Sequence, residues 1–250
     1  MAPGLVTASQ LVAPKLQLRT KCEKADCLTK LIWRNADAVC FDVDSTICKD
    51  EAIDELANFL GARDEVEIIT KRAMNGSLTF REAFKLRLDI MKPSLEQLEL
   101  FLHSHPPRLT QGIEELIQEL RRRNIPVYIV TGGISNLVLP VARSLGIPLK
   151  NVFANELLFD SDGQYAGFDT TKLTSDSGAK NIGKPGVCGF LKKRYGYKNL
   201  VMVGDGATDM EACPPADAFI GFGGNQMREA VFHGCEWMVY DFQTLRNNLP

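Results

Sequence analysis

Two aspartates stand one residue apart directly after an apolar run, in the segment Phe41-Asp42-Val43-Asp44-Ser45-Thr46. Side chains two apart in an extended strand point to the same side, so we expect Asp42 and Asp44 to share a site. Two carboxylates at close range repel each other, and they either bind a cation or leave one of them protonated. Phosphate ester cleavage can use both outcomes, because one carboxylate attacks phosphorus while a second carboxyl group protonates the leaving oxygen. A surface turn is the structural alternative, since Asp, Ser and Thr all favour turns.

A second group of polar and small residues, Thr131-Gly132-Gly133, follows the strand-like run of residues 127–130. A hydroxyl and exposed backbone N–H groups at a strand-to-helix turn can bind a phosphate. A tight loop without a ligand is the alternative, because glycine-rich turns are common.

A third group follows residues 200–203, in the run Gly204-Asp205-Gly206-Ala207-Thr208-Asp209. Ligands of open α/β sheets bind beyond the carboxyl ends of the strands. Asp205 can therefore join Asp42 in binding magnesium, which takes one or two carboxylates, water and a substrate phosphate. Asp209 is expected to orient neighbouring groups, or else to cap the helix that follows.

A basic stretch lies between the second and third groups and contains Lys180 and Lys184, just before a helical pattern that begins near Val187. A lysine at this place can reach a transferring phosphoryl group and offset its negative charge. A solvated surface position is the alternative for either lysine.

The elements that must position these groups form an alternating series. Short apolar runs with strand character are separated by helical patterns, which predicts a parallel sheet with crossover helices. The runs are residues 39–43, 127–130, 200–203, 218–220 and 237–240. At 157–168, the pair Asp162-Gly163 between two apolar runs predicts a small β-hairpin.

The interval 53–107 differs from the rest of the chain because it contains no convincing strand. Thr79 with Glu82, and Ser94 with Gln97, form capping-box patterns that mark the starts of two helices. We therefore expect a helical insertion between the first and second strands.

Composition limits the class of protein. The 250 residues are 45% hydrophobic, enough for one large domain or two small ones. The formal net charge of -2 provides no field for binding nucleic acid or an anionic membrane. No apolar run approaches the length of a membrane span.

Location is predicted from the cysteines and from the first residues of the chain. Seven cysteines are an odd number in a chain too long to need disulfides, which favours a reducing, cytoplasmic compartment. Cys22 and Cys27 have no second pair at zinc spacing and are interpreted as ordinary thiols. The first twenty residues contain Lys15 and Arg19 but no acid, a weak similarity to an organelle transit segment; a disordered tail is the preferred interpretation.

Taken in order, the motifs resemble the haloacid dehalogenase superfamily of phosphohydrolases and, within it, the phosphoserine phosphatase family. The resemblance extends from about residue 37 to the C-terminus. It implies a Rossmann-like α/β core with a parallel sheet, an inserted helical cap and a small β-hairpin insertion. The implied organisation is an N-terminal extension with a first helix (1–35), a catalytic core (36–52 and 110–250) and a cap (53–109).

The resemblance also implies a role for each motif. Asp42 would be the nucleophile and Asp44 the general acid and then base, with Mg²⁺ held by the Asp42 carboxylate, the Asp44 backbone carbonyl and Asp205. The residues implied in phosphate binding are Thr131, Gly132, Gly133, Lys184 and Thr208, with Asp209 in support. Lys184 is preferred to Lys180 because it stands three residues before Val187, as the family lysine does before the equivalent helix. Thr131 departs from the serine common in relatives but also supplies a hydroxyl.

The substrate follows from residues that match those reading an amino acid head group in the family. On a helix that starts at Thr79, Phe80 and Arg87 fall on one face, with Met74 shortly before it. Arg87 can bind a carboxylate bidentately, and Glu51 can receive an ammonium group. The resemblance therefore implies O-phospho-L-serine as a small-molecule substrate, hydrolysed in the final step of L-serine biosynthesis.

Several alternatives stay open. Glu51 and Arg87 can each form an ordinary surface salt bridge. The substrate can be another small phosphate ester, such as phosphoethanolamine or a sugar phosphate, or the chain can be an inactive phosphate-binding module. Transfer of the phosphoryl group to free serine is a further alternative to hydrolysis. The sequence leaves the oligomeric state open, with a homodimer as one candidate.

Overall fold

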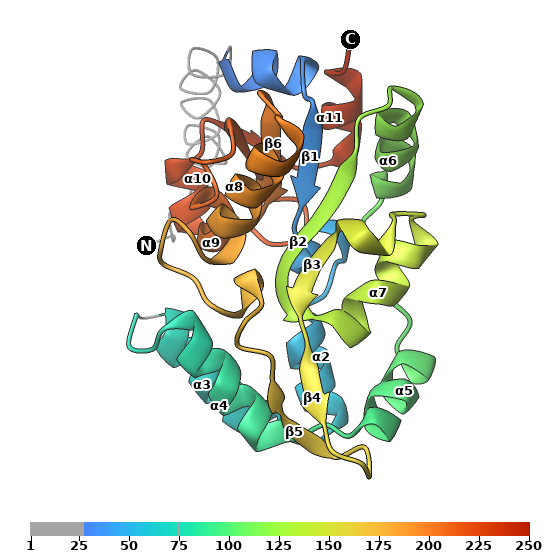
Figure 1. Ribbon diagram of the computed structural model, residues 1–250, viewed down its shortest axis with the longest axis vertical. Helices are drawn as coiled ribbons and strands as arrows, with labels where there is room; N and C mark the ends of the chain where they lie inside the picture. Colours follow the sequence, from blue (N-terminus) through green and yellow to red (C-terminus); the bar gives the residue numbers. More distant parts are fainter. Residues whose placement is uncertain (1–27, 75) are drawn as a thin grey trace, which may run out of the picture.

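The computed structural model describes residues 28–74 and 76–250, without the side chain of Met74 (Figure 1). The predicted tail or transit segment, Cys22 and Cys27 lie outside the described residues. Six parallel strands form one sheet in the order β3-β2-β1-β6-β7-β8, which confirms the predicted parallel sheet. The strands are β1 (Ala38–Phe41), β2 (Val127–Ile134), β3 (Val152–Asn155), β6 (Leu200–Gly204), β7 (Ala218–Phe222) and β8 (Trp237–Val239).

The two faces of the sheet are covered by different helices, because alternate residues of a strand point to opposite faces. Val39 and Phe41 of β1 belong to one apolar cluster, and Ala38 and Cys40 belong to the other. The first cluster is covered by α6 (Ile113–Arg122), α7 (Ser135–Ser144), α11 (Phe242–Asn247) and the helical residues 28–34. The second is covered by α8 (Gly183–Tyr195), α9 (Ala207–Met210) and α10 (Glu229–Gly234) (Figure 1).

The strand register brings the predicted motifs to one edge. Phe41 of β1 pairs with Ile129 of β2 on one side and with Val203 of β6 on the other. Because the strands are parallel, the residues that follow these three positions lie toward the same carboxyl edge of the sheet. Asp42, Thr131 and Asp205 therefore lie near one another at the carboxyl edge of the sheet.

Two predicted strands have different ends in the structure, and one strand was not predicted. The first strand was predicted to reach residue 43 but ends at Phe41, because the chain enters the helical turn η2 (Val43–Ile47), where Ser45 has a φ of 53°. The second was predicted to end at residue 130 but continues to Ile134, so Gly132 and Gly133 are strand residues. The edge strand β3 was not predicted, and it follows the short 3-10 helix η3 (Leu149–Asn151).

The interval 53–107 contains helices and no strand among its described residues, as expected. Both predicted capping boxes are present, at Thr79 and at Ser94. The helices are α2 (Ala52–Phe59), α3 (Arg63–Met74), α4 (Phe80–Met91) and α5 (Leu95–Ser104). In Figure 1 they occupy the lower half of the molecule, below the sheet.

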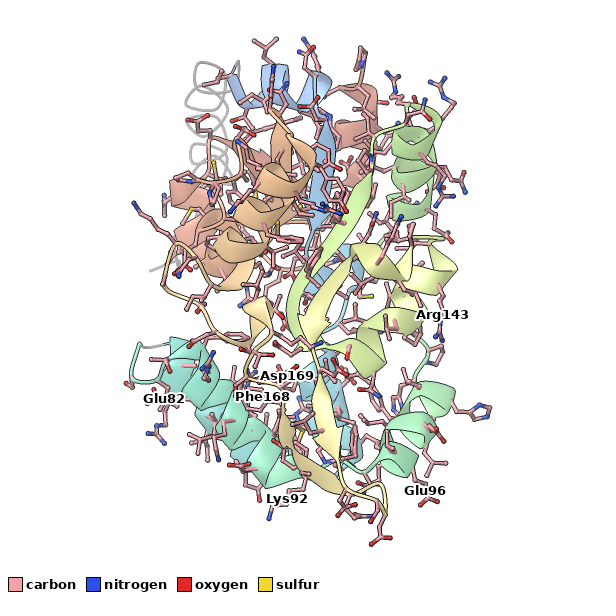
Figure 2. The ribbon with its side chains drawn as sticks, in the orientation of Figure 1. Glu82, Lys92, Glu96, Arg143, Phe168 and Asp169 are labelled. Atoms are coloured by element: carbon pink, nitrogen blue, oxygen red, sulfur yellow. The ribbon has the colours of Figure 1, made fainter. Side chains whose placement is uncertain are left out.

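The predicted hairpin is formed by the antiparallel strands β4 (Leu157–Phe159) and β5 (Tyr165–Phe168), with Gly163 at a φ of 75° in the turn. It lies among the four helices. The ring of Phe168, labelled in Figure 2, contacts Phe84 of α4 edge to face with centroids 5.0 Å apart. These elements share an apolar cluster with Ile134 and Leu137 at the end of β2 and the start of α7. Among the described residues, no helix is both long and apolar enough to cross a membrane.

Candidate active site

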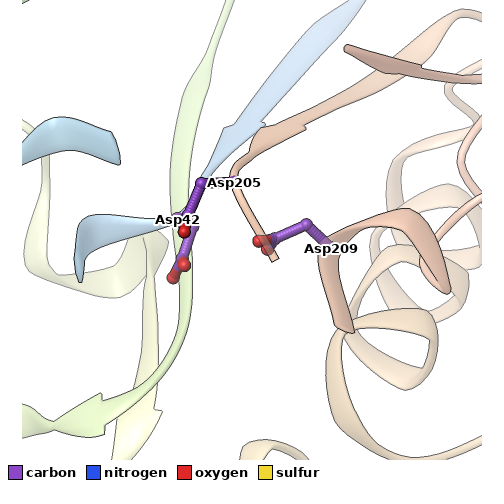
Figure 3. Close-up of side chains that lie close together, drawn as sticks. All are labelled: Asp42, Asp205 and Asp209. Atoms are coloured by element: carbon purple, nitrogen blue, oxygen red, sulfur yellow. The ribbon is translucent and has the colours of Figure 1, made fainter. Parts of the chain in front are cut away.

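Three buried carboxylates lie together at the carboxyl edge of the sheet (Figure 3). One oxygen each of Asp42, Asp205 and Asp209 lies within 4.8 Å of the others. Asp42 follows β1, Asp205 follows β6, and Asp209 lies on the short helix α9. The sheet thus brings together residues more than 160 positions apart in the chain, such as Asp42 and Asp205.

Lys184 supplies the positive charge of this group. Its Nζ lies 2.9 Å from Asp42 Oδ1 and also forms an ion pair with Asp209 Oδ1. Burial alone would lower the pKa of Lys184, but the carboxylates of Asp209 and Asp42 outweigh burial and raise it, so the side chain is protonated. Lys180 is exposed, so only the preferred lysine of the two reaches the carboxylates.

Asp209 lies within α9 and not before a helix, so it does not have the predicted capping position; it contacts both the N-cap residue and Lys184. Its Oδ2 accepts the backbone N–H of Gly206 at 2.9 Å, while its Oδ1 pairs with Lys184. Gly204 makes room for this arrangement, because a Cβ at that position would lie 2.2 Å from Asp209 Cγ. Thr208, also on α9, is half-buried beside Gly206.

Asp44 is placed close to Asp42 by η2 rather than by a continuing strand. The backbones of both residues are nonetheless extended. Asp44 Oδ1 accepts the N–H of Ala52 at 2.9 Å. Burial raises the pKa of Asp44 well above its ordinary value, and the charges of Glu51 and Asp42 raise it further. Both effects favour the protonated form of this carboxyl group.

The segment Thr131-Gly132-Gly133 lies beside these acids at the end of β2. Thr131 Oγ1 accepts the N–H of Gly133 at 3.0 Å. A Cβ on Gly133 would lie 3.4 Å from Asp44 Oδ2, and one on Gly132 would lie 2.8 Å from the ring of Phe80. Glycine at position 132 thus lets α4 approach the edge of the sheet.

Glu51 and Arg87 have different surroundings. Glu51 Oε1 accepts the hydroxyl of Ser45 at 2.9 Å and an N–H of Arg228 at 2.7 Å. Arg87 is half-buried and its Nε donates to the Ala83 carbonyl at 3.3 Å; within the described chain, no carboxylate lies within ion-pair distance of it. Burial lowers the pKa of Arg87, and the charges of Asp54, Glu51 and Asp44 oppose that change. The side chain of Met74 lies outside the described part.

The segment that follows β7 also contributes to the site, although no sequence motif predicted it. Arg228 Nε donates to Asp205 Oδ2 at 2.7 Å, in addition to the ion pair with Glu51. Asn225 Nδ2 lies 2.6 Å from Thr110 Oγ1 and 3.1 Å from the Ser45 carbonyl. The available signal was the glycine pair at 223 and 224 directly after a core strand, at the same edge of the sheet.

Comparison with known proteins gives one consistent family. Residues 36–217 match the family model described as haloacid dehalogenase-like hydrolase. The chain is 51% identical to a phosphoserine phosphatase of Rattus norvegicus over 87% of this chain and 95% of the relative. It is 50% identical to a chloroplastic phosphoserine phosphatase of Arabidopsis thaliana over 87% of this chain and 73% of the relative.

Two solved structures share the fold of this chain. A phospho-aspartyl intermediate analogue of phosphoserine phosphatase has a TM-score of 0.70 and 28% identity, with 85% of this chain and 98% of that chain covered. The structure of DsGPDH of Dunaliella salina has a TM-score of 0.76 and 35% identity; it covers 88% of this chain, which spans 37% of that longer protein.

Proposed function

Because this chain belongs to the haloacid dehalogenase-like hydrolases and, within them, to the phosphoserine phosphatases, we propose that it hydrolyses O-phospho-L-serine to L-serine and phosphate. The observation that carries the proposal is the combination of two groups at one edge of the sheet. Asp42 with Lys184 suits a phosphoryl group. Arg87, which has no carboxylate partner among the described residues, suits the carboxylate of an amino acid, and Glu51 suits its ammonium.

Asp42 is the proposed nucleophile. One of its oxygens attacks phosphorus and the bond from phosphorus to the serine oxygen breaks, which forms an aspartyl phosphate. The Lys184 ammonium, held beside Asp42, offsets the negative charge of the transferring group. Thr131, Gly132, Gly133 and Thr208 are proposed to bind the phosphate oxygens.

Asp44 is the proposed proton carrier. Its raised pKa favours the protonated form, which can donate to the departing serine oxygen. As a carboxylate it then takes a proton from the water that attacks the aspartyl phosphate, which releases phosphate and restores Asp42. Phe80 lies against Gly132, so α4 limits the access of bulk water to the intermediate.

The carboxylates of the site fit a bound metal ion. Asp42 Oδ1 is buried, and in the described chain its near polar neighbour is the Lys184 ammonium, an ion pair at 2.9 Å that leaves room for a further cation contact. Asp42 and Asp205 supply hard oxygen atoms of the kind that Mg²⁺ prefers, and we propose the Asp44 backbone carbonyl as a third ligand. When bound, Mg²⁺ would neutralise charge on the phosphate. Chelation should abolish phosphate release, and added Mg²⁺ should restore it.

The proposed substrate is tested by phosphate release from two esters. Phosphoethanolamine has the phosphate and amine of phosphoserine but lacks the carboxylate, so it leaves Arg87 without a partner. We expect a strong preference for O-phosphoserine. Equal rates would retain the aspartyl-phosphate mechanism but favour another small phosphate ester as substrate, and no release from either would favour a phosphate-binding module.

Location, assembly and domain boundaries remain predictions. A cytoplasmic location and a homodimer are proposed from the sequence alone, and the name of the Arabidopsis thaliana relative is consistent with targeting to an organelle in that protein. The division into a core (36–52 and 110–250) and a cap (53–109) is proposed on the same basis.

A further inference from the structure

Arg228 forms hydrogen bonds with two carboxylates that have different proposed roles. Its Nε donates to Asp205 Oδ2 and its Nη2 donates to Glu51 Oε1, both at 2.7 Å. Asp205 is a proposed metal ligand, and Glu51 is the proposed ammonium acceptor. One guanidinium therefore connects the part of the site that reacts with the part that recognises the amino acid.

The backbone that carries Arg228 is tied to the loop that carries Glu51. Asn225 donates to the backbone carbonyls of Ser45 at 3.1 Å and Cys48 at 3.3 Å. Gln226 Oε1 lies 3.4 Å from the Ser45 hydroxyl oxygen. Arg228 thus reaches Glu51 from a segment that is itself fixed against η2.

The contacts of Glu51 leave one of its oxygens available. Both side-chain partners, Arg228 and Ser45, bind Oε1. Oε2 has no hydrogen-bond or ion-pair partner in the described part of the chain. A carboxylate held by two donors on one oxygen is oriented in advance to accept an ammonium N–H on the other.

The shape of the side chain matters for this arrangement. A guanidinium presents N–H groups in a rigid planar fork and can serve two acceptors at once. A lysine ammonium has the same charge on a flexible stem and does not reproduce that fork. The Arg228 side chain is 29% exposed, and the Asp205 side chain is only 3% exposed, so the contact with Asp205 is the better shielded of the two.

We propose that Arg228 is a positioning residue for substrate selection, which holds Glu51 so that Oε2 accepts the ammonium group of the substrate. The proposal rests on the proposed function, because it concerns the head group of phosphoserine. Arg228 acts through Glu51 and does not itself contact the substrate. Its loss should therefore reduce selection for the amine more than it reduces catalysis in general.

The test compares O-phosphoserine with 3-phosphoglycerate, which keeps the phosphate and carboxylate but has a hydroxyl in place of the amine. We expect Arg228→Ala to raise KM for O-phosphoserine at least about tenfold, because a hydrogen bond to a charged group is lost. KM for 3-phosphoglycerate should change less than about threefold, since a hydroxyl gains little from an oriented carboxylate. The ratio of kcat/KM for the two substrates should fall accordingly. Arg228→Lys should restore less than half of the lost preference.

Two further variants decide between positioning and a general structural effect. In the Glu51→Gln background, Arg228→Ala should leave the ratio of kcat/KM for O-phosphoserine and 3-phosphoglycerate nearly unchanged. The reason is that Glu51, through which Arg228 acts, is already altered. Arg122→Ala removes an exposed arginine paired with Glu119 on α6 and should change neither the ratio nor the melting temperature.

The outcomes separate the two proposals. Wild-type protein without a preference for O-phosphoserine would overturn the proposed function. A wild-type preference that survives intact in a folded Arg228→Ala protein would overturn the positioning role alone. Equal losses on both substrates, or a change confined to the Mg²⁺ concentration needed for activity, would also overturn it. A melting curve for each variant shows that it is folded.

Discussion

The core side and the cap side of the site differ in how their charges are satisfied. On the core side, Lys184 forms ion pairs with Asp42 and Asp209 within the described chain, and all three side chains are buried. On the cap side, Arg87 has no carboxylate within ion-pair distance in the described chain, and Glu51 keeps one oxygen without a partner. The groups that react are held by ion pairs before the substrate binds. The groups that select the substrate keep hydrogen-bonding atoms available for it.

The largest effect should come from the core side. Asp42→Asn replaces the proposed nucleophile with an amide that cannot form an acyl phosphate, so turnover should fall at least about 10⁴-fold. Lys184 keeps its ion pair with Asp209, so the variant should remain folded. Phosphate release with O-phosphoserine and with p-nitrophenyl phosphate should be lost equally.

The control for this prediction is a melting curve together with the same assay at high enzyme concentration. A folded Asp42→Asn protein that retains activity would remove the nucleophile assignment. Loss of activity with only one of the two substrates would show that Asp42 serves recognition, and the contrast between the two sides would then fail.

The next largest effect should come from Arg87 and depend on the substrate. Arg87→Ala removes the proposed carboxylate ligand and should lower kcat/KM for O-phosphoserine about 100-fold, as expected for a partly buried charged pair. Hydrolysis of p-nitrophenyl phosphate, which has no carboxylate, should change less than about threefold. Equal losses on both substrates would show that Arg87 has no selective role. Arg87→Lys, which keeps the charge but not the fork, should fall between wild type and Arg87→Ala.

The same contrast explains how much of the site could be predicted from sequence. The core side follows from residues that come directly after apolar strands, because parallel strands align their carboxyl ends. Asp42 and Asp205 were therefore predicted from their places after strands, whereas Lys184, at the start of α8, was preferred to Lys180 through the family resemblance. The Arg228 contact with Glu51 joins residues 177 positions apart and belongs to no motif, so only the folded chain reveals it.

The errors in strand bounds also have physical reasons. Gly132 and Gly133 were interpreted as a turn, because glycine is common in turns. In the structure they extend β2. Because Gly132 has no side chain, the ring of Phe80 can approach its backbone closely. The strand β3 (Val152–Asn155) is only four residues long, too short for a pattern of alternation to distinguish it from a loop.

A smaller effect should come from the contact between α4 and the segment near η4 (Leu173–Ser175). Arg81 Nε lies 3.1 Å from Asp176 Oδ2, and its Nη2 donates to Ser175 Oγ at 3.0 Å. Because the Arg81 side chain is 40% exposed, the contact stabilises the position of Phe80 over Gly132 only modestly. Arg81→Ala should lower kcat/KM for O-phosphoserine about threefold, by the range for exposed ion pairs.

Lys85→Ala is the matched control for Arg81→Ala. Lys85 lies on the same helix and pairs with Asp89 on its exposed face, so its loss should leave kcat/KM unchanged. Equal effects of the two variants would show that general destabilisation of α4, and not its contact with the core, controls activity. Steady-state kinetics with matched melting curves makes this distinction.

The smallest effect concerns local signals that fix the start of α4. Thr79 Oγ1 accepts the N–H of Glu82, and the Glu82 carboxylate accepts the N–H of Thr79. Thr79→Ala should lower the free energy of unfolding by about 1 kcal/mol, measured by urea titration. Ser104→Ala removes an exposed hydroxyl that donates to a carbonyl within α5 and should change it by less than about 0.5 kcal/mol. A fully folded Thr79→Ala protein could instead show an altered ratio of O-phosphoserine to p-nitrophenyl phosphate hydrolysis. That result would show that the start of α4 takes part in substrate selection, so the cap side of the site would have to include it.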